Sequence, residues 1–237
     1  MKGIASALAG MLLCFSSQAS VVMTGSRVIY PVGAAEVNVQ LTNRDDFPAV
    51  VQVWLDAGDE HSTPQTARAP FITTPPVFRL AAKAGQTVRL RYTGGQMPAD
   101  RESLWWLNFI QIPPVQAQER ETNQLLVMLR SRVKVLYRPA GLSGSPLKMA
   151  QTSRVWLANG KLNLRNDSGY YLAMSVLTVK GGGRQQVVRS QTIAPWSSVS
   201  WAATIPSADA IQMSWINDQG AEMTARVTAG APDHAAR

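Results

Sequence analysis

Apolar and polar residues alternate with a period of two along most of this chain, and that pattern limits it to folds built from β-strands. Side chains of a strand point alternately to its two faces, so alternation gives each segment one face for a core. The first half of the chain shows the pattern at residues 36–42, 49–55 and 87–92, and it contains two longer strand candidates at 103–112 and 125–137. The second half shows it at about residues 155–158, 161–166, 171–180, 186–193, 198–205, 210–216 and 222–228. Short strands separated by turn residues are typical of antiparallel β-sandwiches.

A turn-rich segment at residues 139–144, with proline, glycine and serine, separates the two series of predicted strands. We therefore expect an all-β protein with two tandem immunoglobulin-like β-sandwich domains, at residues 20–140 and 141–237. Each domain has roughly 100 residues, which is enough for a stable core without a disulfide.

The N-terminal segment, residues 1–19, has the features of a secretory signal peptide. One positive charge at Lys2 precedes an apolar run at residues 4–15, and small residues end the segment. The run is too short to span a bilayer. We expect the segment to be cleaved, taking the only cysteine, Cys14, with it. The mature protein is then exported and soluble, with no membrane insertion.

The charge and the residue types exclude several classes of function. The formal net charge is +8, but the basic residues are scattered singly between apolar ones. This pattern argues against nucleic-acid binding and favours an acidic protein partner or a carboxylate ligand. The two histidines, His61 and His234, lie far apart, and neither zinc-ligand spacing nor a nucleophile motif is present. We expect neither an enzyme nor a bound cofactor or metal.

The predicted strand at residues 125–137 is unusual because its first half is apolar on both faces. Leu125, Val127 and Leu129 share one side if no bulge intervenes. One interpretation is a central strand that is buried on both faces. The other is an exposed apolar edge, which proteins normally avoid because it pairs with other chains. In the second case, pairing with another chain is its purpose.

Five segments in the same order and at similar spacing resemble the periplasmic pilus-chaperone family of the chaperone–usher pathway. These segments are SRVIY at 26–30, TTPPVFRL at 73–80, DRESLWWLN at 100–108 leading into IPP at 112–114, RVKVLYRP at 132–139, and WIND at 215–218. They are spread over essentially the whole mature chain. The resemblance implies two immunoglobulin-like sandwiches in an L or boomerang arrangement.

The resemblance also assigns roles to individual residues. Arg27 and Lys134 resemble the pair that anchors the C-terminal carboxylate of a bound subunit, where two cations give charge-assisted hydrogen bonds. Leu125, Val127 and Leu129 resemble the donor strand that enters the groove of an incomplete subunit.

Three further residues, Glu102, Arg138 and Asp218, resemble a salt-bridge set that fixes the angle between the two domains. The TTPP segment resembles a tight turn with a cis bond before Pro75. The loop at residues 115–123 is short and lacks flanking cysteines, which resembles the short-loop subgroup of the family.

The implied function is that of a periplasmic chaperone. It binds, folds and caps fimbrial subunits by donor-strand complementation and delivers them to an outer-membrane usher, without a nucleotide. The free protein is expected to cap itself as a homodimer, because an unoccupied donor strand exposes apolar area. The alternative is a periplasmic immunoglobulin-like adhesion or carbohydrate-binding module, which predicts functional aromatic residues in loops. A hydrolase with an atypical site is a more distant alternative.

Overall fold

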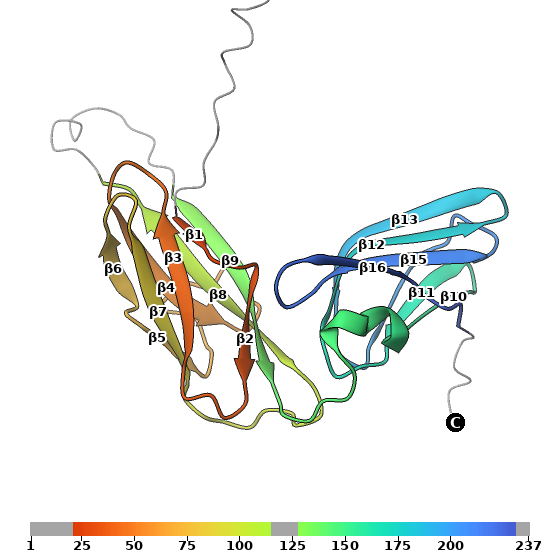
Figure 1. The fold of residues 1–237 in the computed structure, drawn as a ribbon, viewed down its shortest axis with the longest axis horizontal. Helices are drawn as coiled ribbons and strands as arrows, with labels where there is room; N and C mark the ends of the chain where they lie inside the picture. The colour runs from red at the N-terminus through yellow and green to blue at the C-terminus, as the bar shows by residue number, and fades with distance from the viewer. Residues whose placement is uncertain (1–20, 115–127, 231–237) are drawn as a thin grey trace, which may run out of the picture.

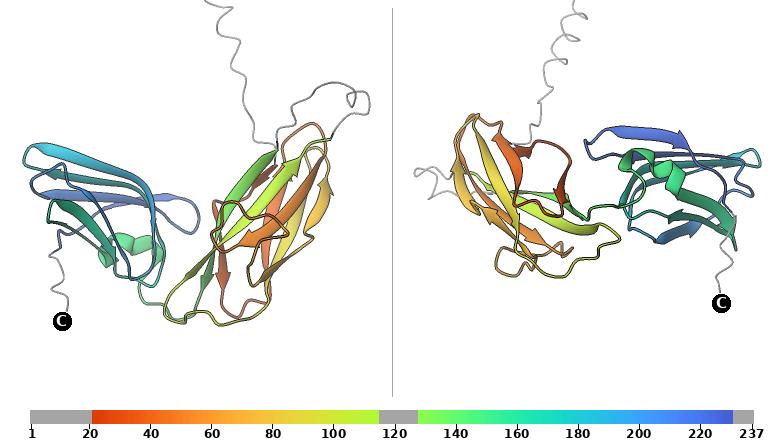
Figure 2. Two further views of the ribbon diagram at one scale, coloured as in Figure 1. Left: turned by 180° about the vertical axis from the view of Figure 1, so that it is seen from behind. Right: turned by 60° about the horizontal axis from the view of Figure 1, so that its bottom comes forward.

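The structure is a computed structural model in which residues 21–114 and 128–230 are described, and they form two β-sandwiches that meet at an angle (Figure 1). This architecture confirms the predicted all-β, two-sandwich fold class. Figure 2 shows the same two bodies from behind and from below, joined by the segment between the strand Leu129–Arg138 and the 3-10 helix Pro146–Thr152. Within the described residues, no helix is both long and apolar enough to cross a membrane.

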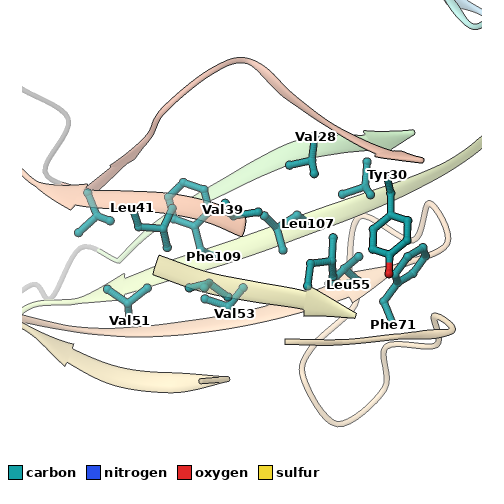
Figure 3. Close-up of a cluster of buried hydrophobic side chains, with 14 of the residues drawn as sticks. Val28, Tyr30, Val39, Leu41, Val51, Val53, Leu55, Phe71, Leu107 and Phe109 are labelled. Carbon is teal, nitrogen blue, oxygen red and sulfur yellow. The ribbon is translucent and has the colours of Figure 1, made fainter. Parts of the chain in front are cut away.

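The first sandwich consists of a four-stranded and a five-stranded sheet. The four-stranded sheet has the order β1 (Val21–Met23), β3 (Val37–Asn43), β7 (Gly85–Tyr92) and β5 (Phe71–Thr74). The five-stranded sheet has the order β2 (Arg27–Pro31), β9 (Leu129–Arg138), β8 (Ser103–Ile112), β4 (Ala49–Asp56) and β6 (Val77–Leu80). Their inward side chains form the core seen in Figure 3, in which Leu41, Val51 and Leu107 are completely buried.

The second sandwich follows the helix η3 (Pro146–Thr152) and also has two sheets. One sheet has the order β10 (Ser153–Ala158), β11 (Lys161–Asn166) and β14 (Ser198–Ala202). The other has the order β13 (Arg184–Ile193), β12 (Leu172–Gly181), β15 (Ala210–Ile216) and β16 (Glu222–Arg226). Its core is separate from that of the first sandwich and contains Leu164, Leu177 and Met213, all completely buried.

Strand β9 has two neighbouring strands along one part of its length and a single described neighbour along the other. It pairs with β8 from Leu129 to Tyr137, but it pairs with β2 only from Lys134 to Arg138. The cause is the path of the N-terminal chain, which pairs with β3 as β1 and then crosses to the other sheet as β2. Within the described residues, β9 is therefore central in its second half and an edge at residues 129–133. The apolar first half of the predicted strand, to which both interpretations referred, lies mostly outside the described residues.

The faces of β9 follow the alternation of its residues. Val133, Val135 and Tyr137 pack in or against the core, so the side chains between them point to the outer face of the sheet. Pairing with β8 continues without a bulge, from Gln111 opposite Leu129 to Ser103 opposite Tyr137. Leu129 therefore lies on the core-facing side of the strand, at its exposed end.

Several predicted boundaries were wrong. The strand expected at 125–137 begins at Leu129, with Met128 outside it, while Leu125 and Val127 lie outside the described residues. The strand expected at 198–205 ends at Ala202, and that expected at 222–228 ends at Arg226. Residues that were expected to continue these strands lie instead in the connections that follow them.

Four short elements were not predicted, namely β1, β5, β6 and η3. β5 and β6 flank the prolines at 75 and 76, whose presence argues against a strand, and the two strands belong to different sheets. The peptide bond between Thr74 and Pro75 is cis, in agreement with the expectation for this turn. The start of η3 did carry a signal, because the Ser145 hydroxyl accepts a hydrogen bond from Leu147 N and a proline follows it.

Candidate functional site

Two cations lie side by side where the free edge of β9 meets β2. Arg27 and Lys134 are directly opposite each other in the parallel pairing of β2 with β9. Residues that are opposite each other in a sheet project to the same face. Val28 and Val135, their neighbours in sequence, are buried in the core. Both cations therefore project from the outer face of the sheet.

Each cation is held by a neutral atom of the second sandwich. Arg27 Nη1 donates a hydrogen bond to the carbonyl oxygen of Ile216 at 3.0 Å. Lys134 Nζ donates to Thr192 Oγ1 at 2.6 Å and lies 5.7 Å from the centre of the Trp106 ring. The site is thus assembled from both domains, with its charges on the first and its neutral partners on the second.

The electrostatics of the pair favour an anion. Burial lowers the pKa of Arg27, and the nearby carboxylates of Asp218 and Glu102 oppose that effect only in part. Burial also lowers the pKa of Lys134, and the Arg27 guanidinium lowers it further. Neither cation forms an ion pair with a described residue, and Arg27 Nε is buried without a hydrogen-bond partner. Two partly buried like charges repel each other, and an anion bound between them relieves that repulsion.

The free edge leads directly to this pair. Residues 129–133 lack a described neighbour on one side, so alternate backbone N–H and C=O groups of β9 are open to another strand. The segment is roughly 16 Å long at about 3.3 Å per residue. It begins at Leu129, which is 54% exposed, and ends beside Lys134. An extended chain that pairs here can place a terminal carboxylate between Arg27 and Lys134.

A polar network covers the outer face next to the free edge. The Asp56 carboxylate is buried and accepts hydrogen bonds from Arg132 Nη2 at 2.7 Å and Asn108 Nδ2 at 2.6 Å. Burial by itself raises the pKa of Asp56, but hydrogen bonds led by that of Arg132 outweigh this effect and the net pKa is lowered. The Arg132 guanidinium lies 4.3 Å from the centre of the Trp106 ring. The Arg130 guanidinium lies 4.9 Å from the centre of the Trp54 ring. These contacts fix the surface along which a partner strand would lie.

A second cluster connects the two sandwiches. Arg138 Nε donates to Glu102 Oε1 at 2.6 Å, and its two terminal nitrogens donate to the Asp218 carboxylate at 2.7 and 2.9 Å. Glu102 Oε2 accepts a hydrogen bond from Tyr171 N at 2.7 Å, and Glu102 N donates to Gly169 O at 2.8 Å. Glu102 and Arg138 belong to the first sandwich, and the other three residues belong to the second. The cluster therefore ties the two bodies together at one point.

The charges of this cluster are strongly coupled. Burial raises the pKa of Glu102, although Arg138 and the Tyr171 amide act in the opposite direction. Burial lowers the pKa of Arg138, but its bonds to Asp218 and Glu102 outweigh burial, and the net pKa is raised. The Glu102 side chain is only 1% exposed. Its charge therefore depends on Arg138.

The structure brings together most of the residues that the sequence singled out. Arg27 lies beside Lys134, and Glu102, Arg138 and Asp218 form one cluster. Leu129 lies at the start of the free edge. Leu125 and Val127 lie outside the described residues.

Sequence reasoning missed the neutral partners of the two cations. Thr192 is 58 positions from Lys134 in the chain, and Ile216 is 189 positions from Arg27. A threonine in a predicted strand and a backbone carbonyl carry no local signal of such a role. The network around Asp56 was missed for the same reason, because Asp56 is 76 positions from Arg132.

Comparison with known proteins agrees with this fold of two sandwiches. Residues 20–143 match the family described as "Pili and flagellar-assembly chaperone, PapD N-terminal domain", and residues 147–227 match "Pili assembly chaperone PapD, C-terminal domain". The chaperone protein MrkB of Klebsiella pneumoniae is 37% identical over 92% of this chain and 95% of its own.

Solved structures give the same result. The periplasmic chaperone SfaE is 32% identical with a TM-score of 0.67, over 88% of this chain and 100% of that one. The Salmonella enterica SafA pilin in complex with the SafB chaperone gives 27% identity and a TM-score of 0.74, over 90% of this chain and 98% of that one. The fold is that of a chaperone of the chaperone–usher pathway. This chain belongs to the PapD-like pilus-assembly chaperones, as its resemblance in sequence predicted.

Proposed function

We propose that this protein is exported to the periplasm, binds fimbrial subunits by lending them a β-strand, and passes them to an outer-membrane usher. The observation that carries this proposal is the free edge of β9, which ends at the cation pair Arg27 and Lys134. A free edge supplies backbone hydrogen bonds to an added strand. A fixed charge pair holds the terminal carboxylate of that strand and so sets the register in which it pairs. The signal peptide at residues 1–19 and the domains at 20–140 and 141–237 belong to the same proposal.

The proposed anchor implies a direction for the added strand. β2 runs parallel to β9 and begins opposite Lys134, where the free edge ends. A subunit strand with its C-terminus at Lys134 must therefore run parallel to β9 along residues 129–133, in line with β2. Its terminal carboxylate then accepts charge-assisted hydrogen bonds from Arg27 and Lys134.

The side chains of the donor strand complete the core of the subunit. Leu129 faces the same side as the core residues of β9 and is exposed, and we propose that Leu125 and Val127 continue this row. Each such residue contributes roughly 1.5–3 kcal/mol when it is fully buried. The salt-bridge cluster of Glu102, Arg138 and Asp218 keeps the two domains at the angle that the site requires.

Replacing Leu129 by serine is expected to weaken subunit binding about tenfold or more, because an exposed leucine that becomes buried in the complex loses its apolar contact. The stability of the free chaperone is expected to change little, because Leu129 is 54% exposed. The measurement is the Kd of a purified fimbrial subunit for each variant by fluorescence anisotropy, with a thermal midpoint for each.

The matched control is Ile72→Ser, which removes an aliphatic side chain that is 46% exposed on the edge strand β5 of the other sheet. This variant is expected to bind subunit like wild type. Equal loss in the two variants means that general surface hydrophobicity drives binding. An unchanged Kd for Leu129→Ser removes this residue from the donor strand.

We also propose that two free chaperones cap each other through their unoccupied edges, because an open apolar edge invites pairing. The free protein is then expected to form dimers whose fraction rises with concentration. Sedimentation velocity checks this, and addition of subunit is expected to dissolve the dimer. A free protein that stays monomeric at high concentration, or a dimer that persists with saturating subunit, contradicts self-capping.

A further inference from the structure

The hydroxyl of Thr192 reaches the cation pair from the opposite domain. Thr192 is the penultimate residue of β13, and Ile193 beside it is buried in the core of the second sandwich. Since side chains alternate along a strand, Thr192 points away from that core. Its Oγ1 accepts a hydrogen bond of 2.6 Å from Lys134 Nζ, which is on the first sandwich.

This hydroxyl retains a hydrogen-bonding capacity that the bond to Lys134 does not use. A threonine hydroxyl has one proton to donate and two lone pairs that accept. The contact with Lys134 occupies a lone pair, because an ammonium group can only donate. Among the described residues, no acceptor takes the Thr192 proton. The proton is thus available beside an ammonium and a guanidinium that form no ion pair with a described residue.

Thr192 is also held firmly in position. It pairs with Ala173 on β12, and two residues before Ala173 the Tyr171 amide donates to Glu102 at 2.7 Å. On the other side, Asn166 Nδ2 donates to the carbonyl oxygen of Ala194 at 3.1 Å. The domain-connecting cluster and the core of the second sandwich therefore both fix the strand end that carries the hydroxyl. A donor fixed in advance loses little freedom when a ligand arrives.

We propose that Thr192 is a third hydrogen-bond donor to the carboxylate that binds between Arg27 and Lys134, so that the anion site spans both domains. This inference rests on the proposed carboxylate anchor. On arrival of the carboxylate, the Thr192 hydroxyl donates its proton to one carboxylate oxygen while its lone pair still accepts from Lys134. Thr192 thus binds the ligand itself and also orients the ammonium group.

The test uses full-length mature chaperone and a labelled synthetic peptide of alternating leucines that ends in a free tyrosine carboxylate. The same peptide with a C-terminal amide is the second ligand. Thr192→Val keeps the shape of the side chain and removes the hydroxyl. It is expected to weaken binding of the carboxylate peptide about tenfold or more, since a hydrogen bond to a charged group is lost. Binding of the amide peptide is expected to stay as in wild type.

Two further variants control for shape and fold. Thr192→Ser retains the hydroxyl and is expected to restore most of the affinity for the carboxylate peptide. Thr178→Val makes the same substitution on β12, away from Lys134, and is expected to bind both peptides like wild type. Thermal midpoints of all variants report whether the fold is intact.

The remaining outcomes separate this inference from the proposed function. If Lys134→Ala loses the preference for carboxylate over amide while Thr192→Val keeps it, Thr192 is not a donor and the anchor stands. If Thr192→Val weakens the binding of both peptides equally, Thr192 acts on the shape of the junction between the two domains, and the inference is also wrong. If wild type binds both peptides equally, the carboxylate anchor itself fails.

Discussion

Replacement of Lys134 by methionine is expected to remove subunit binding while leaving the free chaperone at least as stable as wild type. Burial and the adjacent Arg27 both lower the pKa of Lys134, which means that the folded state disfavours its charge. Methionine removes that charge and keeps an apolar stem against Trp106. Loss of one partner of a shielded charge pair costs about 2–5 kcal/mol, so subunit binding should weaken roughly 30-fold or more. Binding sites typically contain such residues, which lower the stability of the free protein but are needed for its function.

This expectation is checked by co-purification of subunit from periplasmic extracts and by thermal unfolding of the free protein. Arg27→Ala is expected to lose the subunit as Lys134→Met does. The control is Lys161→Met, because Lys161 is exposed on β11 of the second sandwich. A subunit that co-purifies equally with Lys134→Met and with Lys161→Met means that the carboxylate anchor is wrong and that the strand alone explains binding.

Arg138→Met is expected to destabilise the protein by about 3–5 kcal/mol, because it leaves a buried charge without its partner. Arg138 is the shared partner of Glu102 and Asp218, and Glu102 is only 1% exposed. Methionine fills a similar volume, so the main change is electrostatic. Substitution of the exposed Arg226 by methionine is the control and is expected to change the stability little.

The same variant is expected to show a distinct pH dependence. Burial already raises the pKa of Glu102, and Arg138 is the group that opposes this most strongly, so its removal raises the pKa further. The unfolded chain ionises Glu102 near a pH of about 4.3. The variant therefore loses stability as the pH rises from there through the folded-state pKa, and it recovers stability as the pH falls. Urea unfolding between pH 4.5 and roughly 8 measures this. A loss that is the same at every pH contradicts an uncompensated Glu102 charge as its cause.

Much of the fold follows from strand-forming runs that end at turn residues. The strand at 103–112 was predicted with the bounds that the structure has, because a run rich in aromatic and aliphatic residues ends at two prolines. β5 and β6 were not predictable in this way, since each has four residues and they flank a turn with two prolines. Whether β9 is central or an edge depends on where β2 begins. That follows from the crossing of the N-terminal chain between sheets, which no local pattern contains.

The candidate site divides in a similar way. The five charged residues were found by resemblance, and the structure brings each to its partners through pairing registers and the junction of the domains. Thr192 was not found, because its role depends on the angle between two bodies. The pattern of side chains within one strand shows which residues share a face of the sheet. It does not show which residues of another domain lie opposite that face.

The aromatic residues also bear on the alternative of a carbohydrate-binding module. Such a module requires aromatic rings that are open to a sugar. Trp54 is buried, with the Arg130 guanidinium over its ring, and the Trp106 ring is covered by Arg132 and Lys134. These two rings hold cations in place along the outer face of the sheet. Neither ring is open to a sugar, whereas two aromatic residues outside the strands, Phe47 and Trp196, are 44% and 39% exposed.

The most direct test of strand addition is hydrogen–deuterium exchange of the backbone amides of β9 in the free chaperone and in its complex with a subunit. The free protein is measured at a concentration where it is monomeric. The account predicts that amides within residues 129–133 that face the open edge exchange slowly only in the complex, because the subunit strand then accepts their hydrogen bonds. Amides within 134–138, already paired with β2, should change little. Unchanged exchange at 129–133, with new protection elsewhere on the described surface, would contradict the account.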